Sequence, residues 1–294
     1  MKRILIVMLL MIAAPSVGST FTTLAQTPVP QLPPKVLSIG REEVKHNVDA
    51  EHAKVEAAWS KAFAKANWSG YWLGMTSMSG PPEAWFLSGY DSFAAIEKNN
   101  QELEKRQALK AEDTRFRQLD KDLLRGARSM MATFREDLSY QPAVILAQMR
   151  YFRVNTIRVR QGLNDDFIEY RKIIKAGLEK AKSDTHSAVY QIVSGAPNGT
   201  FLVFTPLKSM AEMDPNPASQ KAFQDALGDE NRKKLSELAN KAIISNEPVH
   251  FAFNPEMSYV SKEFAAADPD YWTPKPKPAA KPAAKKPTEK TGGQ

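Results

Sequence analysis

Apolar and polar residues alternate with two different periods along this chain, and the periods follow one another in a fixed order. A period of two residues is typical of strands, and a period of 3.6 residues is typical of helices. In the first half the pattern predicts a strand (36–45), a helix (47–66), two hairpin strands (71–78 and 84–90), a long charged helical region (92–128) and a closing strand (129–134). We expect Asn47 to cap the first helix and a break near Ala111 in the second.

The second half repeats this order. We expect a strand (151–160), a helix (165–182), two hairpin strands (187–193 and 200–205), a helical region (209–245) and a closing strand (249–253). Both halves therefore read β-α-β-β-α-β. That order is typical of ferredoxin-like domains, in which helices cover one face of a four-stranded antiparallel sheet.

Two short motifs recur in equivalent places of the two halves. The segments 134–140 and 253–259 both read Phe, two variable residues, an acidic residue, Leu or Met, Ser and Tyr. A Ser-Gly turn begins at Ser79 and again at Ser194. The turns are 115 residues apart and the Ser-Tyr motifs are 119 residues apart. This recurrence indicates a tandem duplication, and we expect the tyrosine that ends each motif to have a structural role.

A two-layer unit buries only one face of its sheet, so each half needs a partner for the other face. The second copy of the unit is the obvious partner. The predicted fold is therefore α+β, with two tandem ferredoxin-like units packed sheet to sheet as an intrachain pseudo-dimeric α/β barrel. The chain is predicted to consist of a signal peptide (1–25), a proline-rich linker (26–35), the first unit (36–145), the second unit (146–262) and a disordered Lys/Pro/Ala-rich tail (263–294).

The strand and glycine turn at 151–162, followed by Phe167 on the next predicted helix, resemble the opening of a NIPSNAP-type unit. Through these residues the chain resembles the dimeric α/β-barrel superfamily, and most of all its NIPSNAP-like and EthD-like members. The first half departs from the pattern, since Asn47 and Val48 stand where the glycine turn would be. Members of the superfamily range from cofactor-free monooxygenases and haem-handling enzymes to proteins with no established activity. The resemblance therefore implies a fold more than a function.

The charge of the chain is concentrated at its two ends. The formal net charge is +7, of which Lys2 and Arg3 supply +2 and the segment 273–294 supplies +5, so the segment 4–272 carries none. A neutral body lacks the basic face that a nucleic-acid-binding protein needs. We expect the basic tail to be extended, and either to make weak, salt-sensitive contact with anionic envelope surfaces or to serve only as a solvated tail that aids solubility.

Residues 1–25 have the three parts of a secretory signal peptide, with a charged start, an apolar run and a small-residue end. The apolar run of 11 residues is too short to span a bilayer core. We expect export to the periplasm or the extracellular space, with the peptide cleaved. The chain has no cysteine, which excludes disulfides, thiolate metal ligands and a cysteine nucleophile.

One histidine lies on the first predicted helix. His52 precedes Glu56 by four residues, so the two share a helix face and could begin a metal site. The counterpart of His52 in the second half is Phe167, an apolar core position, and no second metal-binding motif accompanies it. A core histidine is therefore favoured, and neither a metal site nor a cofactor is expected.

Another histidine lies in the last predicted strand. If Phe251 and Phe253 pack against the helices, alternation makes His250 point between the two sheets. A neutral imidazole in that place could act as a base or a ligand. The alternative is a partly solvated histidine near a strand end.

Four further polar or amphipathic residues lie in strands of the second half: Arg153, Asn155, Tyr190 and Gln191. In a cavity between the sheets they would bind a ligand, since pockets place a few polar groups among apolar walls. Otherwise they are ordinary solvent-facing strand residues.

The function predicted first is that of an exported small-molecule-binding protein with an apolar cavity between its two sheets. A cofactor-free or haem-dependent monooxygenase-type oxidoreductase is one alternative, and an envelope-associated structural or interaction protein is the other. The sequence has no nucleophile elbow and no nucleotide-binding fingerprint. It leaves open whether the protein is an enzyme, which ligand it binds and what oligomer it forms.

Overall fold

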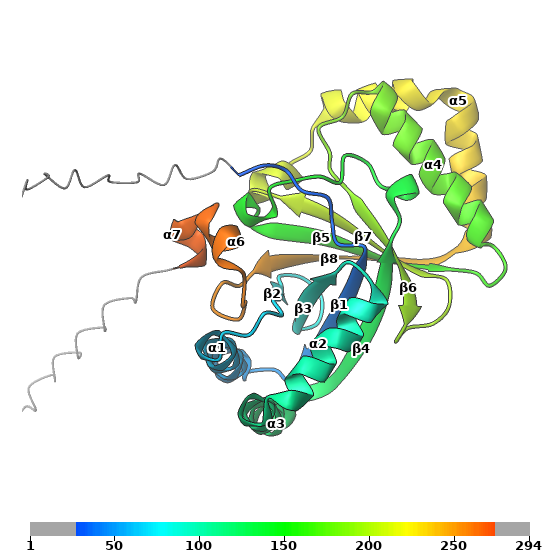
Figure 1. The fold of residues 1–294 in the computed structure, drawn as a ribbon. Coiled ribbons are helices and arrows are strands. Elements are labelled where there is room, and N and C mark those ends of the chain that lie inside the picture. The colour runs from blue at the N-terminus through cyan, green and yellow to red at the C-terminus, as the bar shows by residue number, and fades with distance from the viewer. Residues whose placement is uncertain (1–27, 274–294) are drawn as a thin grey trace, which may run out of the picture.

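The centre of the computed structural model, which describes residues 28–273, is a closed barrel of eight antiparallel strands with helices on its outside (Figure 1). The strands are β1 (Val36–Val44), β2 (Leu73–Ser77), β3 (Glu83–Tyr90), β4 (Leu124–Phe134), β5 (Tyr151–Val159), β6 (Ala188–Ser194), β7 (Thr200–Leu207) and β8 (Ile243–Phe253). The helices are α1 (Asp49–Lys65), α2 (Phe93–Lys105), α3 (Gln107–Lys121), α4 (Asn164–Lys180), α5 (Pro217–Ala242), α6 (Lys262–Ala266) and α7 (Pro269–Trp272). The predicted α+β class is confirmed, and the signal peptide expected at 1–25 lies outside the described residues.

The strand order around the barrel is β1-β3-β2-β8-β5-β7-β6-β4. The strands of each half are therefore neighbours, in the order β4-β1-β3-β2 and then β8-β5-β7-β6. Two seams join the halves, one where Met75 of β2 pairs with Phe253 of β8 and one where Ala132 of β4 pairs with Ile192 of β6. Hydrogen bonding at both seams makes one continuous barrel in place of two separate facing sheets.

Large apolar side chains fill the interior of the barrel. Phe152 packs against Phe253 with ring centroids 4.9 Å apart, and Trp85 packs against Phe251 at 5.0 Å. Val154 and Leu202 belong to the same buried cluster. Because these side chains interdigitate, the space between the two halves is a packed core.

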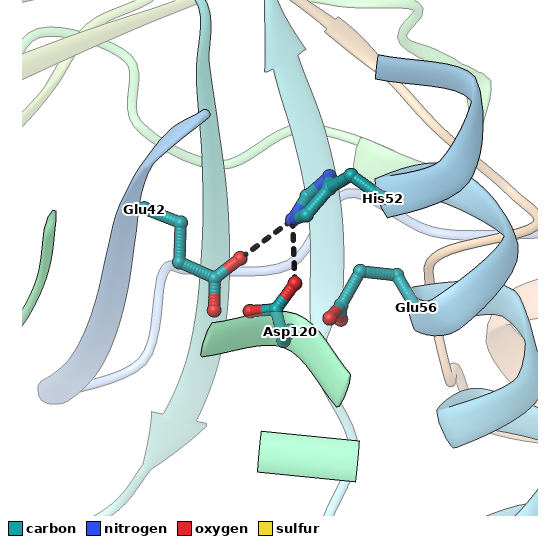
Figure 2. A group of neighbouring side chains, drawn as sticks. All are labelled: Glu42, His52, Glu56 and Asp120. Carbon is teal, nitrogen blue, oxygen red and sulfur yellow. Dashed lines mark hydrogen bonds and ion pairs between the residues drawn. The ribbon is translucent and has the colours of Figure 1, made fainter. Parts of the chain in front are cut away.

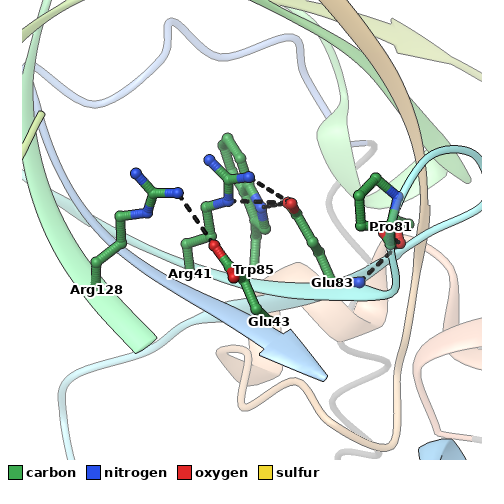
Figure 3. A network of polar contacts seen from close by, with 7 residues as sticks. Arg41, Glu43, Pro81, Glu83, Trp85 and Arg128 are labelled. Carbon is green, nitrogen blue, oxygen red and sulfur yellow. Dashed lines mark hydrogen bonds and ion pairs between the residues drawn. The ribbon is translucent and has the colours of Figure 1, made fainter. Parts of the chain in front are cut away.

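Ion pairs close one end of this interior, where the C-terminal end of β1 lies beside the N-terminal end of β3 (Figure 3). Arg41 donates through Nε to Glu83 at 2.9 Å, and the Trp85 indole donates to the same carboxylate at 2.9 Å. Arg128 pairs with Glu43 at 3.2 Å. The Glu83 carboxylate is thus satisfied by two donors, which suits a buried charge.

The Ser-Tyr motifs close the two seams, each from one half onto the other. Backbone bridges join Tyr140 to Ser187, just before β6, and Tyr259 to Trp72, just before β2. The serine before each tyrosine accepts a hydrogen bond from a backbone amide across the seam at 2.9 Å, from Val189 to Ser139 and from Gly74 to Ser258. The repeated motif is therefore part of the machinery of barrel closure.

Several predicted boundaries are wrong. The helical region expected over 92–128 breaks at Arg106, whose φ and ψ of −95° and 73° separate α2 from α3, and not near Ala111. Both closing strands begin earlier than expected, at Leu124 and Ile243, because pairing with β1 and β5 extends them through polar sequence. Asn47 does not cap α1, since its φ of 67° is left-handed and Val48 occupies the cap position.

The predicted disorder from residue 263 onward is wrong for 263–273, which form α6 and α7. Trp272 is buried, and its indole donates to the Ala147 carbonyl at 2.7 Å. Phe264 packs against Trp272 with ring centroids 5.0 Å apart. Burial of these aromatic side chains orders the segment, and the remaining tail, from residue 274, lies outside the described residues.

Candidate functional site

Four ionisable side chains meet between the first half of the barrel and two of its helices (Figure 2). Glu42 comes from β1, His52 and Glu56 come from α1, and Asp120 comes from the last turn of α3. The His52 Nε2 atom lies 2.9 Å from a Glu42 oxygen and 3.6 Å from an Asp120 oxygen. One potential ligand atom from each of the four residues lies within 4.8 Å of the others.

Local structure explains why these side chains converge. Strand alternation turns Ile39 into the barrel core and therefore Glu42 toward the helices. Residues four apart on a helix share a face, so His52 and Glu56 both lie on the buried face of α1. The end of α3 is tied to β1 by Lys45, whose Nζ donates to the Asp122 carbonyl at 2.7 Å. This bond joins the chain directly after β1 to the chain directly after α3, so the ends of the two elements, with Glu42 and Asp120, lie beside each other.

The cluster is deeply buried, and its carboxyl groups are poorly satisfied. His52 is 2% exposed, Glu56 4% and Asp120 3%, whereas Glu42 is half-buried. Glu56 Oε1 and Asp120 Oδ1 have no hydrogen-bond partner. Burial, followed by the charge of Glu42, raises the pKa of Glu56 to about 9 and that of Asp120 to about 6. The positive charge of Arg117 acts on both carboxyls, but this side chain forms its ion pair with Asp113 at 2.9 Å.

The corresponding place in the second half is not a polar cluster. β5 and α4 have the same lengths as β1 and α1 and follow them by 115 residues. At that offset Glu42, His52 and Glu56 correspond to Ile157, Phe167 and Arg171. Ile157 and Phe167 are 4% and 0% exposed and belong to one apolar cluster. The architecture therefore does not need polar groups at the positions of Glu42 and His52, whereas the position of Glu56 holds a buried charged residue, Arg171, in the second half.

A large cavity opens at the barrel end opposite the Arg41 ion pairs. Its volume is about 1190 Å³. The side chains at its inner end also belong to the barrel core, and they are Leu37, Leu73, Leu87, Phe152, Tyr190 and Phe204. The chain at 28–34, α2 and α6 form its rim. Exposed apolar side chains on the rim, such as Val29 and Leu32, make the entrance hydrophobic as well.

Of the residues predicted to bind a ligand, Tyr190 lines this cavity. It is buried, and its hydroxyl donates to the Pro34 carbonyl at 2.7 Å. That bond secures the N-terminal segment at the rim. His52 is buried as expected for a core position, but among carboxylates and not among apolar groups. The sequence did not predict Glu42 and Asp120 as its neighbours.

His250 does not lie between the sheets, and the alternative of a partly solvated histidine is what the structure shows. Phe251 and Phe253 point into the barrel core, not toward the helices, so alternation turns His250 outward. Arg153, its register partner on β5, is exposed on the same outer face. Partial burial, followed by the charge of Arg153, lowers the pKa of His250.

Asn155 and Gln191 also lie on the outer face, so their predicted place in a cavity between the sheets is wrong too. Asn155 donates to the Asn246 side chain at 2.9 Å. Gln191 accepts a hydrogen bond from Arg135 at 2.9 Å. Val154, next to Asn155, and Tyr190 and Ile192, on either side of Gln191, belong to the barrel core, so the two amide side chains point away from it.

Within residues 28–273 no helix combines the length and the apolar character needed to cross a bilayer. No protein-family model matches the chain, and no curated protein matches it.

Solved structures with a similar arrangement include an anthrone oxidase-like protein, with 12% identity over 81% of this chain and 96% of that one and a TM-score of 0.49. A protein provisionally named a monooxygenase from Fusobacterium nucleatum has 11% identity over 74% and 91%, with a TM-score of 0.47. A chlorite dismutase variant from Candidatus Nitrospira defluvii has 11% identity over 76% and 92%, with a TM-score of 0.43. With identities this low and TM-scores below 0.5, these likenesses transfer no activity to the chain.

Proposed function

We propose that the protein binds a small apolar molecule in the cavity at the open end of the barrel. The observation that carries this proposal is the volume of about 1190 Å³ with an aromatic and aliphatic inner wall. Ligand cavities in proteins are typically about 300–1,000 Å³ and mostly apolar, so this one has room for a molecule of drug-like size. The site differs from the one expected between the sheets, because the barrel interior itself is packed.

The location of the polar side chains narrows the choice between binding and catalysis. His250, the base expected in an oxidoreductase, lies outside the barrel and away from the residues that line the cavity. Polar residues that line the cavity include Tyr190, whose hydroxyl donates to the Pro34 carbonyl, and His186, whose Nδ1 donates to the Gln141 carbonyl at 2.7 Å. The apolar inner wall supports binding, and the lining does not by itself indicate a monooxygenase reaction.

A binding measurement with Nile red, whose fluorescence rises in apolar surroundings, tests this function. Leu146→Trp fills part of the cavity from a half-buried lining position. Leu119→Trp is the matched control, because Leu119 is 48% exposed on α3 and does not line the cavity. We expect wild type and the control to bind the dye saturably and the Leu146 variant to bind at least about tenfold more weakly. Equal affinity of all three would contradict the proposal.

We also infer that the two halves are tandem ferredoxin-like units that form an intrachain pseudo-dimer of the NIPSNAP-like and EthD-like kind. The equal lengths of the first strand and helix in each half, and the equivalent seams, support this inference. Export of the mature protein, and contact of its basic tail with an anionic envelope surface, are proposals that rest on the sequence alone. The segments concerned, 1–25 and 274–294, lie outside the described residues.

A further inference from the structure

We propose that Glu42, His52, Glu56 and Asp120 form a binding site for a divalent first-row transition metal ion. The site lies between β1 and the helices α1 and α3, and none of its residues lines the barrel-mouth cavity. The proposal therefore stands independently of ligand binding in that cavity.

The donor atoms are of the right kind and close to the right distance. One imidazole nitrogen and three carboxylate oxygens suit Zn²⁺, Mn²⁺ or Fe²⁺, which bind such donors at about 2.0–2.2 Å. Bonds of that length place neighbouring ligand atoms roughly 3–3.5 Å apart in tetrahedral or octahedral geometry. The separations of 2.9 Å and 3.6 Å from His52 already lie near this range. All four candidate ligand atoms lie within 4.8 Å of one another, so a bound ion would draw the more distant ones closer together.

Two buried carboxylate oxygens in the cluster lack a hydrogen-bond partner, and the one on Asp120 has only the 3.6 Å contact with His52. Glu56 and Asp120 are 4% and 3% exposed, and Oε1 of the first and Oδ1 of the second accept no hydrogen bond. Buried polar atoms in folded proteins are nearly always paired. A cation between these two side chains would satisfy both oxygens at once and offset the repulsion among three carboxylates.

The chain offers no protein cation that could replace the metal among the residues described. Burial raises the pKa of both carboxyls, Glu56 and Asp120, and the charge of Arg117 offsets part of this rise. However, the Arg117 side chain is 68% exposed and pairs with Asp113. Its guanidinium also lies 5.3 Å above the Trp59 ring, outside the cluster. His52, the basic group within the cluster, contacts Glu42 and Asp120 but makes no hydrogen bond or ion pair with Glu56.

The second half of the barrel shows that the fold alone does not explain the cluster. Ile157 and Phe167 occupy the places of Glu42 and His52 and pack in an apolar core. Burying carboxylates where an apolar pair would pack is unfavourable unless something binds them. At the Glu56 position the second half also buries a charged side chain, Arg171, but the carboxylate and imidazole of Glu42 and His52 occur in the first half alone. They point to a ligand, and the donor set suits a metal cation.

The test uses the full chain, stripped with EDTA and then titrated with Co²⁺, whose visible absorption reports its coordination, and with Zn²⁺ and Mn²⁺. We expect one equivalent to bind, a new Co²⁺ absorption band and a rise in melting temperature. Glu56→Gln and His52→Gln should weaken binding by at least about 100-fold, since each removes a ligand while keeping side-chain size. Glu51→Gln, an exposed position on the same helix, should bind like wild type.

A variant that fails to fold would not be informative, so Glu42, the least buried of the four with its side chain 15% exposed, provides a second change. Glu42→Gln leaves the buried face of α1 intact, and circular dichroism of the metal-free protein confirms its fold before titration. Saturable binding lost in Glu42→Gln but kept in Glu51→Gln supports the site. The proposal is overturned if wild type binds none of the three metals, or if it binds them no better than folded Glu42→Gln and Glu56→Gln.

Discussion

The serine hydroxyls of the two Ser-Tyr motifs make a quantitative prediction about what closes the barrel. Ser139 Oγ accepts the Val189 amide at 2.9 Å and donates to the Arg135 carbonyl at 2.7 Å. Ser258 has the same two bonds in the other seam, accepting from the Gly74 amide and donating to the Asn254 carbonyl at 2.6 Å. Replacing either serine by alanine removes both bonds and introduces nothing else.

The loss should be larger than that of an ordinary surface hydrogen bond. Val189 is fully buried, so its amide finds no water when Ser139 is removed. An unpaired buried donor costs about 1–3 kcal/mol in free energy of unfolding. For a fold of this size each kcal/mol lowers the melting temperature by about 2–4 °C. The two serines lie on different seams and share no partner, so the double change should cost about the sum of the single ones.

Urea unfolding followed by tryptophan fluorescence measures these free energies directly. Ser129→Ala is the matched control, because Ser129 is an exposed residue of β4 and should stay within about 0.5 kcal/mol of wild type. If Ser139→Ala and Ser258→Ala prove no more destabilising than this control, the hydroxyl bonds do not hold the seams. In that case the repeated motif needs another explanation.

Four further predictions concern the seams, the cluster and the tail. Tyr259→Ala should lower the free energy of unfolding by about 2–4 kcal/mol, because its ring packs on Trp72 and its hydroxyl donates to the Trp68 carbonyl; unchanged urea unfolding with lost ligand binding would make it functional instead. The segment 150–262 alone loses β2 and β4 and should aggregate or dimerise in size-exclusion chromatography, whereas a monomer with cooperative unfolding would argue against the pseudo-dimer. In metal-free protein Glu56 keeps its proton up to a pKa of about 9, above its ordinary value of 4.5. Between these pH values the folded state therefore binds more protons than the unfolded state, and the free energy of unfolding should fall by up to about 1.4 kcal/mol per pH unit. Glu56→Gln should lack this slope, and equal slopes in the two proteins would contradict the prediction. A chain ending at Trp272 should sediment less with anionic vesicles at low salt than the full chain, and equal binding would exclude a role for the tail.

The number and order of the strands could be predicted because strand and helix periods are local properties. The errors lie where distant pairing decides the outcome. Leu124 to Arg128 read as the end of a charged helix, yet they form a strand because β1 supplies a partner along their whole length. Arg106 breaks the helix one turn before the expected place, through a backbone conformation that composition does not reveal.

The direction of side chains in the last strand could not be predicted for a different reason. Several strands of this barrel, including β5 and β7, carry apolar residues at both sets of alternating positions, because the core covers their inner face and helices cover part of their outer face. Alternation separates Phe251 from His250 but does not say which of them faces inward. Closure of the barrel decides this, and closure depends on seams that join residues far apart in the sequence, such as Ala132 with Ile192 and Met75 with Phe253.

The candidate metal site illustrates how a tandem chain can serve as its own control. His52 and Glu56 share a helix face and are visible in the sequence, but Glu42 and Asp120 join them only after folding, from elements 78 residues apart. Even so, comparison of the halves at their 115-residue offset places Ile157 and Phe167 opposite Glu42 and His52. Both halves build the same strand and helix, so the fold itself does not require a carboxylate and an imidazole at these two positions. This departure from the repeat supports the proposed metal site.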